Sequence, residues 1–142
     1  MRRAVVPALL LATLIAAPAS ACSIAYRPPA DRVALANRAV FGHVLWVHYD
    51  HDPEPAEPAN PPGRRYTAKL RATRVYKGGR APAVRFRSST DDSSCGLGRL
   101  LPGQDLGLVL DSVGPPFPVG LGDAFSRAEL DQATGGRWHR PR

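Results

Sequence analysis

The sequence predicts an all-β domain: a small closed or nearly closed antiparallel barrel of five strands, with one or two short flanking helices. Segments rich in β-branched and aromatic residues recur along the chain, turn-forming glycines and prolines separate them, and only two stretches have a helical pattern. The chain has 142 residues, 44% of them hydrophobic and 22% charged, which suits one globular domain. This composition excludes a coiled coil, a collagen-like chain and a multidomain enzyme.

Residues 1–21 have the three parts of a secretory signal peptide. Arg2 and Arg3 form a basic start, an apolar run follows over 4–17, and small residues precede Cys22. A membrane-spanning helix needs about 20 apolar residues, so this shorter run predicts export and cleavage after residue 21. We therefore expect a secreted protein, periplasmic or extracellular.

The mature chain is expected to begin with a short helix and a long strand. Asp31 can accept hydrogen bonds from a first helical turn, and the apolar residues after it recur on one side, which predicts a helix over about 31–38. Residues 39–49 favour the first strand, with a bulge at Gly42. Five prolines between positions 50 and 65 then predict a projecting loop.

Period-two alternation predicts the second strand at 66–76, with a bulge where the phase slips near Arg74 to Tyr76. A turn at 77–80 leads to a third strand at 84–87. A polar loop from Ser88 to Gly98, which holds Cys95, comes after that strand.

After a turn at 100–104, the apolar segment 106–110 predicts a buried fourth strand. Prolines interrupt the next segment, so a fifth strand at 119–121 is expected to be short and at an edge. Asp123 can cap a terminal helix over 124–133, and residues 135–142 are expected to form a flexible tail.

Export also predicts the state of the two cysteines. Cys22 and Cys95 are the only cysteines in the chain, and an oxidising compartment allows them to stay paired. A disulfide that closes so long a loop contributes about 4 kcal/mol in the chain-entropy model. We therefore expect a Cys22–Cys95 disulfide that staples the domain.

Several short motifs, in this order, resemble those of a known family. They are Cys22-Ser23 at the expected mature terminus, Val40 to Val44, Arg74 to Gly78, Ser94-Cys95-Gly96 and Leu101 to Gln104. Over about residues 22–111 the chain thus resembles the netrin-like domain of bacterial relatives of the tissue inhibitors of metalloproteinases. The resemblance implies an oligonucleotide/oligosaccharide-binding (OB) type barrel, which agrees with the five strands expected above, and a domain at 22–134.

The resemblance also implies a mode of action. In the animal inhibitors, the amino-terminal cysteine is bridged to a loop cysteine, and the two segments form a ridge that enters the protease cleft. The corresponding ridge here consists of Cys22, Ser23, Ile24 and Ala25 beside Ser93, Ser94, Cys95 and Gly96. The α-amine and carbonyl of Cys22 would chelate the catalytic zinc of a target metalloproteinase, which keeps one position open. Ser23 would enter the specificity pocket, and the Pro-rich loop 53–62 would be a second contact. Ile24 stands where the family's inhibitors have another cysteine.

A different fate for Cys22 stays open. The stretch Ala19-Ser20-Ala21-Cys22 approximates the cleavage site of a bacterial lipoprotein. In that case the protein is an envelope lipoprotein, anchored to the membrane through Cys22, with a structural or interaction role. The two outcomes exclude each other, because an acylated amine cannot chelate zinc and a thioether sulfur cannot bridge Cys95.

No enzymatic site is expected. His48, Asp50, His51 and Asp52 offer donors for a transition metal, but a hydrated loop is the usual explanation for such a stretch. His43 lies within a strand, so we expect it to be packed or hydrogen bonded. Asp91, Asp92, Ser93 and Ser94 are typical of a turn, and no histidine stands at a recognisable spacing from either serine. We therefore expect neither catalysis nor a cofactor.

The formal net charge is +7, and the basic residues are spread along the chain. Aromatic residues interleaved with arginines could form a face that stacks bases. These residues are Trp46, Tyr49, Tyr66, Tyr76 and Phe86 with Arg71, Arg74, Arg85 and Arg87. Because export argues against nucleic acid, we favour core packing with a basic outer surface, and we expect a protein as partner.

Overall fold

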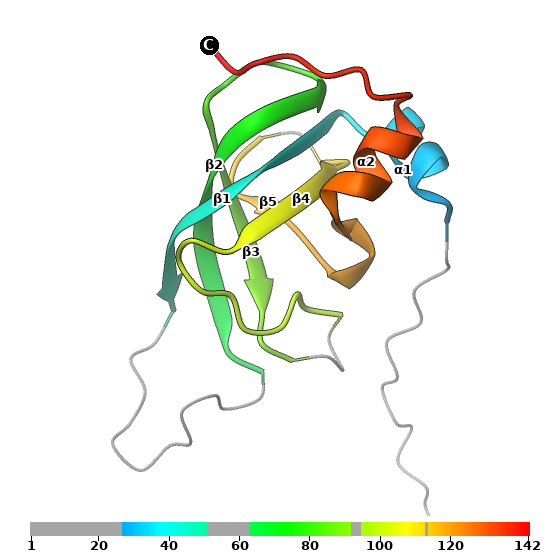
Figure 1. Ribbon diagram of the computed structural model, residues 1–142. Helices are drawn as coiled ribbons and strands as arrows, with labels where there is room; N and C mark the ends of the chain where they lie inside the picture. The colour runs from blue at the N-terminus through cyan, green and yellow to red at the C-terminus, as the bar shows by residue number, and fades with distance from the viewer. Residues whose placement is uncertain (1–26, 51–62, 92–94, 113) are drawn as a thin grey trace, which may run out of the picture.

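The computed structural model describes residues 27–50, 63–91, 95–112 and 114–142 (Figure 1). The chain forms, in order, α1 (Pro29–Leu35), β1 (Arg38–Tyr49), β2 (Arg65–Lys77), β3 (Ala83–Ser89), β4 (Asp105–Leu110), β5 (Phe117–Pro118), the 3-10 turn η2 (Leu121–Asp123), β6 (Ala124–Phe125) and α2 (Arg127–Ala133). The fold is mostly β, as the sequence predicts. Within the described residues, no helix is long and apolar enough to cross a membrane.

The strands form one curled sheet, a half-barrel, in the order β5-β3-β2-β1-β4-β6. All neighbours are antiparallel except β5, which runs parallel to β3. The segment 117–125 supplies both edge strands: β5 pairs with β3, and β6 pairs with β4. Six strands are therefore present where five were expected, and the last predicted strand lies at 117–118 rather than 119–121.

Irregular pairing between the two long strands bends the sheet. The register of β1 against β2 shifts between Phe41 and Gly42, where Thr73 of β2 is the extra residue. A Cβ on Gly42 would lie 1.9 Å from the carbonyl oxygen of Arg71, so only glycine fits this close approach. Two further shifts occur, one of them beside Tyr76, which confirms the predicted phase slip and adds to the local coiling.

The sheet has an apolar cluster on each face. The larger cluster fills the concave side and includes Tyr66, Leu70, Phe86 and Leu108, each exposed by 1% or less. The smaller cluster lies between the convex side and the helices; it consists of Val33, Ala36, Ala39, Phe41, Tyr76, Val109 and Leu130. Alternation within each strand accounts for this division, because successive side chains point to opposite faces.

The first helix begins two residues earlier than predicted and ends three residues earlier. Pro29 occupies the start, where a missing N–H costs nothing. The backbone of Ala36 is already extended, and the N–H of Asn37 donates to the carbonyl of Leu110. This bond joins the chain to the sheet directly after the helix. The predicted helix at 31–38 is therefore corrected to 29–35.

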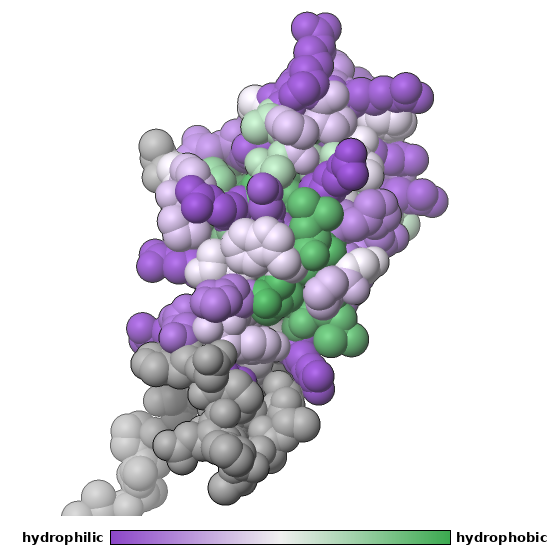
Figure 2. All heavy atoms as spheres, turned by 90° about the vertical axis from the view of Figure 1, so that its left-hand side faces the viewer, coloured by the Kyte–Doolittle hydropathy of each residue, from purple (hydrophilic) through white to green (hydrophobic). Residues whose placement is uncertain are grey.

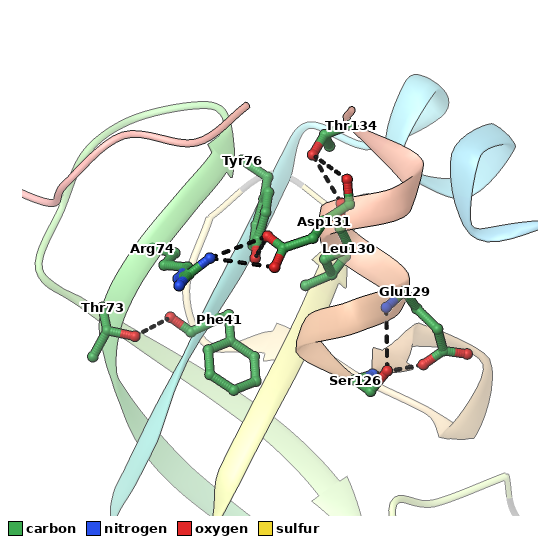
Figure 3. A network of polar contacts seen from close by, with 9 residues as sticks. All are labelled: Phe41, Thr73, Arg74, Tyr76, Ser126, Glu129, Leu130, Asp131 and Thr134. Atoms are coloured by element: carbon green, nitrogen blue, oxygen red, sulfur yellow. Dashed lines mark hydrogen bonds and ion pairs between the residues drawn. The ribbon is translucent and has the colours of Figure 1, made fainter. Parts of the chain in front are cut away.

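The second helix is capped by Ser126, not by Asp123. The Ser126 hydroxyl accepts from the N–H of Glu129, and the Glu129 carboxylate accepts from the N–H of Ser126, which is a capping box (Figure 3). Asp123 instead accepts from the N–H of Gly120 and closes the preceding 3-10 turn. The helix consequently starts at Arg127, and residues 124–125 become β6.

Polar contacts attach α2 to β2. The Asp131 carboxylate accepts from the Arg74 guanidinium at 3.2 and 3.3 Å and from the Tyr76 hydroxyl at 2.7 Å (Figure 3). The end of the chain, for which the sequence predicts a flexible tail, also contacts β2. Arg74 stacks on the Trp138 ring at 4.5 Å from its centroid, and His139 and Val75 exchange two backbone hydrogen bonds.

Candidate functional site

The Cys95 loop, defined here as residues 95–98, is held against the end of β3. The N–H of Gly96 donates to the carbonyl of Asp91 at 3.0 Å, and that of Gly98 to the carbonyl of Ser89 at 3.2 Å. The Ser88 hydroxyl accepts from the N–H of Leu97 at 2.9 Å and donates to the carbonyl of Val119 at 2.8 Å. The loop is thus fixed both to β3 and to the segment that carries β5.

Cys95 has a left-handed backbone, with φ of 58°. Its carbonyl accepts a hydrogen bond of 2.7 Å from the N–H of Leu121. Two glycines permit the close packing around it: a Cβ on Gly96 would lie 2.2 Å from the Ser89 hydroxyl, and one on Gly120 would lie 2.8 Å from the Cys95 carbonyl. The position of this cysteine is therefore set by the fold around it.

A first hollow of about 670 Å³, called here the amino-terminal hollow, lies on one side of Cys95. Arg27, the first described residue, lines it together with Cys95, Arg32 and the 3-10 turn. Arg27 is where the segment toward Cys22 begins, so this segment starts at the same hollow that Cys95 lines.

A charge cluster forms another wall of this hollow. Arg32 of α1 forms ion pairs with Asp123 and, at 3.1 Å, with Asp111 at the end of β4. Burial raises the pKa of Asp123, while the N–H of Gly120 and the Arg32 guanidinium act in the opposite direction. Within the described residues, the buried Nε of Arg32 has no hydrogen-bond partner.

A second hollow, of about 760 Å³, lies on the other side of the Cys95 loop. Arg65, Arg87 and the end of β3 line it, together with Asp50 and Asp91. Cys95 and Gly120 line both hollows, so the loop forms a partition between them.

The structure places only part of the predicted ridge. Cys95 and Gly96 lie at the partition just described. Cys22, Ser23, Ile24, Ala25, Ser93, Ser94 and the loop 53–62 lie outside the described residues. The Cys22–Cys95 disulfide and the ridge that the resemblance implies therefore stay predictions.

The other candidate residues fall in separate places. His43 Nδ1 is hydrogen bonded to Asp105, as expected for a residue within the sheet. His48 and Asp50 stand at the end of β1, while His51 and Asp52 lie outside the described residues. Among the residues that the structure describes, no group of three or more His, Cys, Asp or Glu side chains is arranged to hold a metal ion.

Most of the aromatic residues that suggested a base-stacking face are in the core. Tyr66 and Phe86 lie in the concave cluster, and Tyr76 packs beneath the helices. Tyr49 packs edge-on against Tyr66, with ring centroids 5.7 Å apart. Trp46 differs from them in being 38% exposed.

Arg32, Asp111 and Asp123 are site residues that were not predicted from the sequence. Arg32 and Asp123 are 91 positions apart in the chain, and the local pattern favours a helix cap at Asp123. The spacing of these residues in the sequence does not indicate a cluster. The pairing of β1 with β4 and the turn before β6 bring its members together.

Comparison with known proteins adds no family. No model of a known protein family matches the chain, and no curated protein is significantly similar to it.

Proposed function

We propose that this protein is an exported protein-binding module that contacts its partner with its mature amino terminus, tied by a Cys22–Cys95 disulfide beside the Cys95 loop. The observation that carries the proposal is that Arg27 and Cys95 line the same hollow. An extended chain reaches about 3.3–3.6 Å per residue, so the five steps from Arg27 to Cys22 span up to roughly 17 Å. A disulfide between the two cysteines is therefore within reach.

The fixed Cys95 loop supports a binding role. A protein ridge binds tightly when its backbone is ordered before it meets the partner, because less conformational entropy is lost on binding. The bonds from Ser88, Ser89 and Asp91 hold residues 96–98, and Leu121 holds Cys95 itself. A disulfide to Cys95 would extend this order to the amino-terminal segment.

We also propose that the half-barrel is a variant of the OB-type barrel that the resemblance implies. In such a barrel, the fifth strand closes the sheet between the third and fourth strands. Here the segment 117–125 pairs with β3 in parallel at its start and with β4 in antiparallel at its end. The turn η2 between these pairings divides the closing strand into β5 and β6.

The partner that fits the resemblance is a zinc metalloproteinase. A free α-amine and the carbonyl of the same residue can form a five-membered chelate on a zinc that has an open coordination position. The amine binds in its unprotonated form, and its ordinary pKa of about 7.7–8.0 makes this form accessible near neutral pH. Ser23, the next residue, would enter the specificity pocket, so its side chain would select the protease.

The test is inhibition of a panel of zinc metalloproteinases by two variants. One carries an extra alanine before Cys22, and its matched control carries an extra alanine after Arg142. We expect the first to lose inhibition, because the chelating amine is displaced, and the control to keep it. In the second variant, Ser23→Arg, we expect a different set of inhibited proteases. Equal potency of the two extended proteins would exclude the chelate.

A further inference from the structure

The convex face of the sheet is covered by helices over only part of its area. Near the start of β1, Ala39 and Phe41 pack under α1 and α2 with Tyr76 and Val109. Further along the sheet, on the same face, the side chains are polar and mostly exposed. Five cations stand there: Arg65, Lys69, Arg71, Arg85 and Arg87. With Trp46 of β1, they are called here the basic face.

Strand register places these residues side by side. Lys69 lies between Trp46 on β1 and Arg85 on β3, and Thr67 lies between His48 and Arg87 in the next row. Directly paired residues project from the same face, about 5 Å apart across strands and about 7 Å apart along a strand. The basic face is therefore a regular array of positive charge.

None of these cations forms an ion pair within the described part of the chain, although Asp50 and Asp91 line the second hollow together with Arg65 and Arg87. No hydrogen bond joins the side chain of Arg65, Lys69, Arg71, Arg85 or Arg87 to a carboxylate of the described residues. Asp105 stands at the border of the face, where it is bonded to His43. An array of like charges repels itself, and an anionic partner relieves that repulsion.

A hollow of about 460 Å³ lies at one side of the array. Three cations line it, Arg38, Lys69 and Arg85, together with Trp46 and the apolar residue Phe117, and no carboxylate does. Arg38 donates to the carbonyl of Ala81 at 2.9 Å, while its buried Nε has no partner among the described residues. A hollow with cationic and apolar walls suits a ligand that carries a phosphate group on an apolar molecule.

Apolar side chains adjoin the same surface. Leu45 is 43% exposed and Trp46 38%. Leu101, 53% exposed, belongs to a turn that is hydrogen bonded to the neighbouring Val44 through Gly103 and Gln104. Figure 2, which looks onto the side of the molecule at the left of Figure 1, shows a hydrophobic strip bordered by hydrophilic residues. Protein surfaces that bind at the headgroup layer of a membrane typically combine aliphatic side chains, tryptophan, and arginine or lysine.

We propose that the basic face docks on a membrane surface rich in anionic phospholipids, with a headgroup phosphate in the hollow beside Trp46. The phosphates meet the cations of β2 and β3, and Leu45, Trp46 and Leu101 enter the interface. Single-stranded nucleic acid fits less well, because successive bases need several exposed rings, while Tyr66 and Phe86 are buried and Tyr49 is partly buried against Tyr66. This docking does not depend on the proposed disulfide or on protease inhibition.

The test is binding of the purified chain, shown by intact mass to carry no lipid, to two kinds of vesicle. We expect binding to phosphatidylglycerol mixed with phosphatidylcholine, its loss at high salt, and little binding to phosphatidylcholine alone. Each cation near an anionic surface contributes about 1 kcal/mol, so Lys69→Glu with Arg85→Glu weakens vesicle binding at least about 30-fold. The matched control, Arg127→Glu with Arg140→Glu, changes the net charge equally on exposed positions elsewhere and weakens it less than about threefold.

Fluorescence supplies a readout at the surface itself. The chain has two tryptophans, so Trp138→Phe leaves Trp46 as the only one. We expect its emission to shift to shorter wavelength on anionic vesicles, because the ring enters a less polar environment. Equal weakening by the two double variants, equal binding to both vesicles, or an unchanged Trp46 emission would overturn the proposal. Binding to an oligothymidylate but not to vesicles would overturn it in favour of nucleic acid.

Discussion

The N–H of Leu121 donates a hydrogen bond of 2.7 Å to the carbonyl of Cys95. This bond joins the loop between β3 and β4 to the segment that supplies both edge strands of the sheet. The loop and the edges of the half-barrel are therefore parts of one structure. A change that loosens residues 117–125 is expected to loosen the candidate contact surface as well.

The first prediction concerns the charge cluster beside that bond. Arg32→Met leaves the half-buried carboxylate of Asp123 without its cation, and we expect the free energy of unfolding to fall by about 2 kcal/mol. Urea denaturation at neutral pH measures the change. Arg127→Met, at an exposed position, is the control and should change stability by less than about 0.5 kcal/mol. Equal effects of the two variants would show that the cluster is not a structural anchor.

The second prediction concerns the bend of the sheet. Gly42→Ala places a Cβ against the backbone of Arg71, which cannot move without breaking the pairing of β1 with β2. We expect a loss of about 3 kcal/mol in thermal or urea unfolding. Gly79→Ala is the matched control, since a Cβ there meets nothing within 4 Å. A Gly42→Ala protein as stable as the control would contradict the register described here.

The third prediction concerns alkaline pH. Burial, helped by the hydrogen bond to Asp131, raises the pKa of Tyr76 to about 12, and burial raises that of Tyr66 to about 12. The unfolded chain loses these protons near pH 10. Both tyrosines therefore contribute stability that is fully present below about pH 10 and is lost as the pH rises toward 12.

Tyr76→Phe isolates one of these contributions. We expect it to cost about 1 kcal/mol near neutral pH, because the bond to Asp131 is lost. Between about pH 10 and 12, its stability should fall less steeply than that of the parent protein. Urea unfolding at several pH values measures both the loss of stability near neutral pH and the slope of stability against pH. The same slope for both proteins would show that Tyr76 does not retain its proton in the folded state.

The sequence predicts the long strands well and the short ones poorly. β1, β2, β3 and β4 lie within two residues of their predicted bounds. Residue type in β1, alternation in β2 and the apolar run in β4 are signals that the local sequence carries. β5 and β6 have two residues each, which is too short for any period to appear. Their positions follow from pairing with the edges of the sheet, which only the folded chain provides.

The start of α2 was predictable, and the charge cluster was not. Ser126 with Glu129 three residues later is a capping signal as clear as the one assigned to Asp123. By contrast, Arg32, Asp111 and Asp123 have no local pattern, since distant segments bring them together. For the same reason, the uncovered basic face cannot be foreseen, because the sequence does not tell which part of the sheet the helices will cover.

The measurement that tests the proposed mode of action most directly is the intact mass of the exported protein, together with mapping of its linked peptides. We predict a chain that begins at Cys22, weighs two hydrogens less than its reduced form and yields a peptide pair joined through Cys22 and Cys95. A mass increased by acyl chains on Cys22, or two free thiols in protein recovered outside the cytoplasm, would contradict it.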